Sequence, residues 1–169
     1  MTESPSTERL RAEPLSLAHA DELAVLHADE HVMNATMGGT KDRRESREWM
    51  ERNLRHGDEG GLGVFVFRDR ETGRFAGLGL VRPLEVDGRE EIEIGYVVAA
   101  ELWGRGLATE MAEELVRFAG RSGLHDLVAL TLPENAASRR VMERVGFSYE
   151  REVEQSDETF VFYRRRSAP

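Results

Sequence analysis

Cysteine is absent from the 169 residues, and this absence excludes several kinds of chemistry. The chain has no disulfide framework, no thiolate nucleophile and no cysteine zinc site. It also has no apolar run near the roughly 20 residues that span a bilayer. Residues 1–8 lack the basic start and apolar stretch of a signal peptide. We therefore expect a cytoplasmic protein without a membrane partner.

Basic charge is scarce relative to acidic charge. The formal net charge is −9 and the pI is about 5.1, which argues against a nucleic-acid partner, because nucleic-acid binders gather Lys and Arg on one surface. The excess of carboxylates suits a cationic partner such as an amine, with plain solubility as the other explanation. Lysine occurs once, at Lys41, against 22 arginines. We attribute that bias to genome composition.

Length and composition fit a single globular domain. At 19.1 kDa, with 40% hydrophobic and 33% charged residues, the chain is large enough to bury a core. We expect residues 1–8 to form a flexible tail and residues 9–169 to form the domain.

The hydrophobic periodicity predicts the order of the secondary-structure elements. Apolar residues at helical spacing indicate helices at about 18–28, 41–56, 106–120 and 136–145. Alternating or short apolar runs indicate strands at 10–14, 63–68, 75–83, 91–98, 127–132, 149–154 and 159–165. This order favours an α/β (α+β) fold in which a mixed sheet carries helices on both faces.

The most informative stretch follows a strand and opens a helix: Trp103-Gly104-Arg105-Gly106-Leu107-Ala108-Thr109-Glu110. Two glycines permit a tight turn and close approach to a ligand. The free N–H groups and the dipole at the helix start favour a phosphate, and Arg105 adds positive charge. A plain strand-to-helix connection is the alternative. The stretch is neither a Walker motif nor a dinucleotide fingerprint, since Gly-Lys-Ser/Thr and the third glycine are missing.

Two further features surround this stretch. Asn135 and Ser138 open a helix that leads to Val145-Gly146-Phe147, and Asn135 could serve only as its N-cap. Glu93 is an acid on an otherwise largely apolar strand. An outward-facing carboxylate on a half-exposed sheet is the simpler explanation for it.

Taken in order, these segments resemble the GNAT acetyltransferases. Within that family, the chain is similar to the ribosomal-protein N-terminal acetyltransferases, which Leu10–Pro14 and Glu48-Trp49-Met50 also resemble. The resemblance covers about residues 10–165. It implies a GNAT-like fold with a mostly antiparallel sheet of about seven strands, acetyl-CoA as co-substrate, and no metal. The activity it implies is transfer of an acetyl group to an amine.

The resemblance also implies how coenzyme A is held. The backbone of Tyr96, Val97 and Val98 should pair with the pantetheine arm like an added strand. Asn135 should hydrogen-bond that arm, with Ser138 near the thioester sulfur. Trp103 stands where the family has Gln or Arg. The pyrophosphate should rest on the amides of the turn residues, namely Arg105, Gly106, Leu107, Ala108 and Thr109.

The same resemblance implies the catalytic groups. Glu93 holds the position of the base that takes a proton from the amine, directly or through a water. A backbone N–H at Val98 could stabilise the charge that develops on the thioester oxygen. Met142 stands where many members have a tyrosine that protonates the leaving thiolate. Ser138 is the substitute that this branch implies.

The resemblance implies that the acceptor is a small-molecule amine or a protein N-terminus. We expect its pocket to be formed by the 33–39 loop, including Met33, by Trp49 and by the 155–158 turn. Carboxylates near these segments would attract a cationic amine; they are Asp29, Glu30, Asp157 and Glu158.

Two alternatives to an active enzyme remain open. The loss of the tyrosine at Met142 favours a CoA-binding module that is weak or inactive. His27 and His31 lie four residues apart, but no third ligand accompanies them, so a metal site is disfavoured. A homodimer is also left open.

Overall fold

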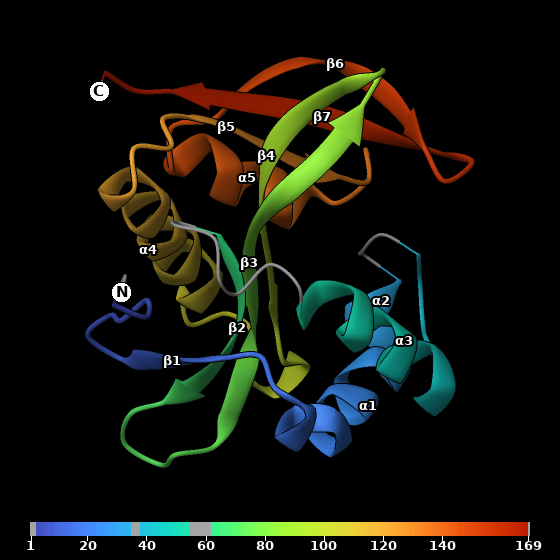
Figure 1. The fold of residues 1–169 in the computed structure, drawn as a ribbon, viewed down its shortest axis with the longest axis vertical. Helices are drawn as coiled ribbons and strands as arrows, with labels where there is room; N and C mark the ends of the chain where they lie inside the picture. Colours follow the sequence, from blue (N-terminus) through green and yellow to red (C-terminus); the bar gives the residue numbers. More distant parts are fainter. Residues whose placement is uncertain (1–2, 35–37, 55–61, 169) are drawn as a thin grey trace.

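The computed structural model describes residues 3–34, 38–54 and 62–168, and its strands form one open, mixed sheet (Figure 1). The strand order is β1-β2-β3-β4-β5-β7-β6, and only the β4–β5 pair is parallel. The expected seven-stranded, mostly antiparallel sheet is confirmed. The strands are β1 (Leu10–Pro14), β2 (Gly63–Asp69), β3 (Phe75–Val86), β4 (Arg89–Val98), β5 (Asp126–Thr131), β6 (Ser148–Gln155) and β7 (Glu158–Arg166).

Helices cover both faces of the sheet, as expected (Figure 1). One group precedes β2 in the chain: η1 (Leu17–His19), α1 (Ala20–Ala28), α2 (Glu30–Met33) and α3 (Arg43–Asn53). The other group follows β4: the short η3 (Ala100–Leu102) lies at the end of β4, and α4 (Leu107–Arg121) and α5 (Ala136–Arg144) pack on the opposite face. In the described part of the chain, no helix has the length and apolar character to cross a membrane.

The two faces of the sheet have separate cores. On one face, α4 and α5 bury Met111, Leu115 and Met142 against the sheet. On the other, α1 to α3 bury Leu23, Val32 and Met50 against β2 and β3. The sheet is therefore buried on both sides where β3 and β4 lie, which explains why these strands read as largely apolar.

Three differences from the sequence prediction stand out among shifts of one or two residues elsewhere. The helix expected from residue 18 begins as a 3-10 turn, and α2 was not foreseen. The helix expected over 41–56 begins at Arg43, because Asp42 caps it reciprocally with Glu45. Its expected last two residues lie outside the described residues.

The third difference is β3, which continues past Pro83 to Val86. Pro83 has no N–H to donate, and it pairs across from Ile92 in the β3–β4 ladder. Ala99 donates its N–H to the Ala76 carbonyl, and alternation along the ladder turns the backbone of Pro83 away from β4. The β2 pairing has already ended at Val81. A proline is tolerated there because no strand of the described residues needs the missing donor.

Helix α1 is tied to the edge of the sheet by an ionic network. Arg68 on β2 contacts Glu13 of β1 at 3.0 Å and Glu22 of α1 at 2.7 Å. His19 also reaches Glu13 at 3.0 Å. Hydrogen bonding from His19, followed by that from Arg11 and Arg68, lowers the pKa of Glu13 to about 2, against the effect of burial. Arg68 also lowers the pKa of Glu22.

Residues before β1 are in contact with α4. Arg9 forms an ion pair with Glu110 at 2.6 Å, and the Ser6 amide donates to Glu114 at 3.3 Å. The flexibility of residues 1–8, and the division into a tail and one domain, stay predictions.

Candidate active site

The central feature of the site is the separation of β4 from β5. These parallel strands share a single pair, Glu93 with Val128, and beyond it the two strands are no longer paired. The Ala99 amide donates to Ala76 on β3 at 2.9 Å, so alternation points the amides of Tyr96 and Val98 the other way. Backbone donors and acceptors of β4 therefore face the opening between the strands.

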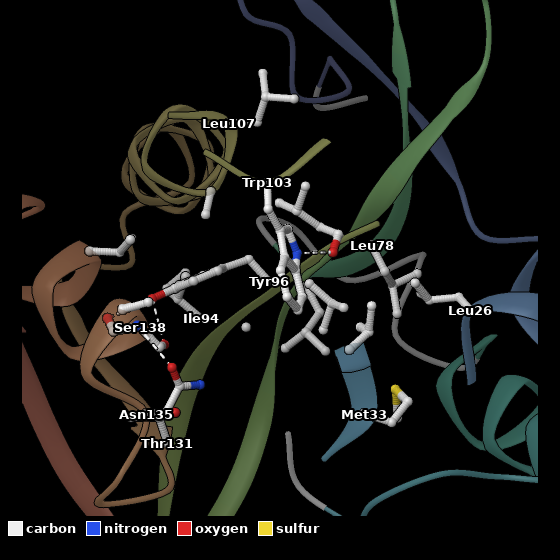
Figure 2. A pocket seen from close by; sticks show the side chains of 18 of the residues that line it. Leu26, Met33, Leu78, Ile94, Tyr96, Trp103, Leu107, Thr131, Asn135 and Ser138 are labelled. Carbon is white, nitrogen blue, oxygen red and sulfur yellow. Dashed lines mark hydrogen bonds between the residues drawn. The ribbon is translucent and has the colours of Figure 1, made fainter. Parts of the chain in front are cut away.

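A cavity of about 690 Å³ occupies this opening and reaches both faces of the sheet. Figure 2 shows Leu26 and Met33 approaching it from one side and Ser138 and Asn135 from the other. The cavity wall includes nearly all of the sequence-predicted residues. These are Met33, Trp49, Glu93, Tyr96, Val97, Val98, Gly106, Leu107, Ala108, Thr109, Asn135 and Ser138.

The start of α4 forms one end of the cavity. Gly104 and Gly106 have left-handed φ values of 79° and 77°, which glycine adopts without strain. Gly106 is the N-cap, and no side chain of the described residues caps the helix there. The first helical bond runs from the Glu110 amide to the Gly106 carbonyl. The amides of 107–109 are therefore available to a phosphate, and the dipole favours its charge.

Arg105 is the predicted residue that the structure places differently. Its side chain lies in a separate hollow with Asp69 and Glu101 and is not part of the main cavity wall. Its carbonyl accepts a hydrogen bond from Arg9 at 2.9 Å. The expectation that this guanidinium adds charge at the phosphate-binding turn is not met in this conformation.

Trp103 braces the open edge of β4. Its indole N–H donates to the Val98 carbonyl at 2.8 Å (Figure 2), and its side chain is about half exposed (51%) beside the cavity. The bond occupies a carbonyl that would otherwise lack a strand partner. Trp103 thus fixes the end of β4 where the amide of Val98 faces the opening.

Tyr96 and Ser138 form a hydroxyl pair that sequence reasoning missed. The Tyr96 hydroxyl lies 3.1 Å from Ser138 Oγ and donates to the Ser138 carbonyl at 3.3 Å (Figure 2). Burial raises the pKa of Tyr96 to about 12, against a smaller opposing effect of the Ser138 hydrogen bond. Its phenol therefore keeps its proton at neutral pH. The sequence had suggested a role only for the backbone of Tyr96.

Two other residues of this wall define what the pair can do. Asn135 is the N-cap of α5, and its Oδ1 accepts from the Ser138 amide at 3.1 Å. Met142 is buried in the cavity wall and carries no proton to donate. In this part of the cavity wall, the hydroxyls of Tyr96 and Ser138 carry protons to donate and the side chain of Met142 does not.

Glu93 faces the cavity and is only 5% exposed. The simpler explanation of an outward-facing, solvated carboxylate is wrong. Arg82 on β3 forms an ion pair with it at 3.0 Å. Arg82 in turn donates to Asn53 Oδ1 of α3 at 2.7 Å. This chain of contacts fixes the carboxylate against the cavity wall.

The other end of the cavity is formed by α1, α2 and α3. His27 is buried, and its Nδ1 lies 2.7 Å from Ser46 Oγ, while its ring meets Trp49 edge-on at 5.2 Å. Burial, followed by the charge of Lys41, lowers the pKa of His27 to about 4, so the ring is neutral at pH 7. His31 sits on the next helix and is exposed. Across the described ranges, no three His, Cys, Asp or Glu side chains gather to hold a metal.

The two loops expected to form the acceptor pocket are only partly among the described residues. Residues 35–37 of the expected 33–39 loop lie outside the described residues. The 155–158 turn is not among the described residues that line the cavity, and neither are Asp29 and Glu30. Asp29 instead caps α2 by accepting from the His31 amide at 2.9 Å.

Comparison with known proteins agrees with this geometry. A family model described as "Acetyltransferase (GNAT) domain" matches residues 9–148. The chain belongs to the GNAT acetyltransferases. The Bacillus subtilis protein YkkB is 31% identical over 144 residues, which cover 85% of this GNAT chain and 83% of YkkB.

Solved structures share the fold of this GNAT chain. An acetyltransferase from Agrobacterium tumefaciens superposes with a TM-score of 0.84 at 25% identity, covering 98% of this chain and 95% of that one. The ribosomal L7/L12 alpha-N-protein acetyltransferase RimL, solved with coenzyme A, superposes with a TM-score of 0.80. At 18% identity it covers 97% of this chain and 98% of its own, a likeness that concerns the fold.

The residues present fit the acetyl-CoA that GNAT enzymes use. The uncapped start of α4 suits the pyrophosphate, and the open edge of β4 suits the amides of the pantetheine arm. The cavity continues from there to Glu93. This GNAT chain is accordingly an acetyltransferase, and its individual residue roles stay predictions.

Proposed function

We propose that this enzyme transfers an acetyl group from acetyl-CoA to a primary amine, of a small molecule or a protein N-terminus, by direct attack on the thioester. The observation that carries the proposal is the continuity of one cavity. It joins the uncapped start of α4, the open edge of β4 and the buried carboxylate Glu93. A thioester seated along β4 would therefore meet an amine that enters from the side of α1 to α3.

Binding relies mainly on backbone groups. The amides of 107–109 hold the pyrophosphate, and the edge of β4 at Tyr96 to Val98 pairs with the pantetheine arm. The Val98 amide then points toward the thioester oxygen, where it stabilises the negative charge that develops as the amine attacks. Trp103 keeps that edge in place through the Val98 carbonyl.

Glu93 receives the proton that the amine must lose. The carboxylate is buried and fixed by Arg82, so its orientation is set before the acceptor binds. A proton passes to it directly or through a water. The chain has no cysteine that could form an acetyl-thioester with the enzyme. Direct attack by the amine needs no such intermediate.

The leaving thiolate is protonated by the hydroxyl pair. Ser138 Oγ and the Tyr96 hydroxyl lie 3.1 Å apart in the cavity wall. A proton that leaves Ser138 Oγ is replaced from the Tyr96 hydroxyl, and Tyr96 regains its proton from solvent as the products leave the cavity. This pair supplies the function that Met142 cannot.

Release of free CoA in the presence of a panel of amines tests the proposal. We expect Glu93→Gln to keep its affinity for CoA while its kcat falls on the order of a hundredfold, as for loss of a general base. Calorimetry measures the affinity and thiol titration measures the rate. The matched control is Glu85→Gln, an exposed acid on the neighbouring strand, which should leave both unchanged.

Met142 favours one other function, a CoA-binding module without turnover. That function predicts tight binding of CoA, with no amine of the panel releasing it faster than buffer. Equal rates for Glu93→Gln and the parent enzyme would remove Glu93 from the mechanism.

A further inference from the structure

The charged groups in the cavity wall are predominantly basic, although the chain as a whole is acidic. Among the described residues that line the cavity, Glu93 is the one carboxylate, whereas Lys41, Arg82 and Arg144 are cations. Arg144 belongs to α5, on the far face of the sheet. Lys41 and Arg82 lie with α1 and α3, at the acceptor end.

Lys41 is the only lysine of the chain. Its backbone amide donates to the His27 carbonyl at 2.8 Å, which anchors this position to α1. Any residue except proline could make that bond, so it does not explain the side chain. Within the described residues, the ammonium has one hydrogen-bond partner, the Gly39 carbonyl at a long 3.5 Å.

The surroundings of Lys41 disfavour its charge. Burial lowers the pKa of this half-buried side chain, Glu45 opposes the effect, and the positive charges of Arg52 and Arg82 lower the pKa further. Two cations that face one cavity repel each other, and the repulsion costs more where water is excluded. An anion between them would remove that cost.

Arg82 has capacity for such an anion. Its Nε is used by Glu93 and its Nη1 by Asn53. Nη2 has no hydrogen-bond partner in the part of the chain that is described. Because no buried side-chain nitrogen or oxygen there lacks a partner, Nη2 is accessible. Arg82 can thus donate to a ligand while it still holds Glu93.

From this cluster we infer that the acceptor is a small amine that carries a carboxylate on the same molecule, as an amino acid does, and that Lys41 and Arg82 bind this carboxylate. Because Arg82 contacts Glu93 at 3.0 Å, a carboxylate on Arg82 brings a neighbouring amine within reach of the base. The pyrophosphate of CoA is excluded as the anion at this place, since α4 begins on the opposite face of the sheet. The inference rests on the proposed function.

The test compares each amino acid with its amide, which has the same side chain and amine but no negative charge. We expect the parent enzyme to favour the acid in kcat/KM. A charged hydrogen bond supports a preference of roughly tenfold to hundredfold. Lys41→Met should abolish most of this preference, mainly through KM, and Lys41→Arg should keep most of it. The matched control is Arg47→Met, an exposed cation of α3 paired with Glu51, which should keep the preference in full.

A parent enzyme that acetylates amides as well as acids would overturn the inference, and so would an equal loss of preference in Arg47→Met. Thermal unfolding of each variant excludes a folding defect. If no amine releases CoA, the proposed function fails, and equilibrium binding then decides the inference alone. N-acetylated amino acids should bind the CoA-loaded parent and lose affinity about tenfold or more in Lys41→Met, whereas the absence of binding to the parent would contradict it.

Discussion

In the proposed function, coenzyme A is bound by backbone amides at one end of the cavity, and the acceptor is bound by side chains at the other end. The CoA end consists of consecutive residues at the start of α4 together with the open edge of β4. The acceptor end gathers His27, Lys41, Trp49 and Arg82 from α1, α3, β3 and the segment between the helices. The comparison teaches that, under this proposal, a co-substrate shared by the family is held mainly by backbone geometry, whereas selection of the acceptor depends on side chains from distant parts of the chain.

The largest expected effect is on the CoA end of the cavity, and it follows from substituting Gly106. Its φ of 77° disfavours any other residue, and a Cβ there would meet open space except for Arg9 at 3.7 Å. Gly106→Val should therefore act by distorting the amides of the turn and by filling the approach of the pyrophosphate. We expect CoA affinity, measured by calorimetry, to fall at least about a hundredfold, as several charge-assisted hydrogen bonds are lost.

Gly88→Val is the matched control for this loss of affinity. Gly88 has a similar φ of 76° in the β3–β4 turn, which is not part of the described cavity wall. Gly88→Val should introduce the same backbone strain and leave CoA affinity unchanged. Unchanged CoA affinity in Gly106→Val would refute the assignment of the turn.

The second test removes the ion pairs that tie α1, part of the acceptor end, to the edge of the sheet. Arg68→Met leaves the carboxylates of Glu13 and Glu22 without their shared partner, which we expect to cost roughly 2 kcal/mol of unfolding free energy. Since α1 forms part of the acceptor wall, KM for the amine should rise while CoA affinity stays. A rise in the CoA dissociation constant equal to the rise in KM would mean that the two ends are not independent.

The same network predicts a pH dependence of stability. The folded pKa of Glu13 is about 2 and that of Glu22 is also lowered, below the ordinary value of 4.5. Groups with a depressed pKa stabilise the fold above their unfolded pKa, and this contribution is lost as pH falls toward the folded value. The difference in unfolding free energy between the parent and Arg68→Met should be full above about pH 5 and shrink toward pH 2. Denaturant titrations at several pH values measure it.

The smallest expected effect concerns the hydroxyl pair between the two ends. Tyr96→Phe keeps the ring and removes the phenolic proton. We expect kcat to fall about tenfold, less than the hundredfold or more typical of losing a general acid, because Ser138 still carries a proton, and we expect CoA affinity to be preserved. Ser138→Ala should lower kcat at least as much. In the double variant, kcat should fall no further than in the more affected single variant, because the two hydroxyls act as one relay. Additive losses in the double variant would show that they act separately.

Much of the fold followed from local patterns. The Gly104-x-Gly106 turn, the N-cap at Asn135 and the alternation of β4 depend on residues a few positions apart, whose dihedral angles and hydrogen bonds are set locally. The strand boundary at Pro83 was wrong for the converse reason. Whether its missing donor matters depends on which strand lies beside it.

By itself, then, the sequence determined the order of the elements, the turn that opens α4 and the candidate base on β4, because each is encoded within one short segment. Only the tertiary structure decided that Tyr96 meets Ser138, 42 residues away, that Arg105 faces another hollow, and that Lys41 and Arg82 line the same cavity. The physical reason is that these contacts depend on how the sheet separates at β4 and β5 and on how two sets of helices pack on opposite faces. No periodicity within a single segment carries that information.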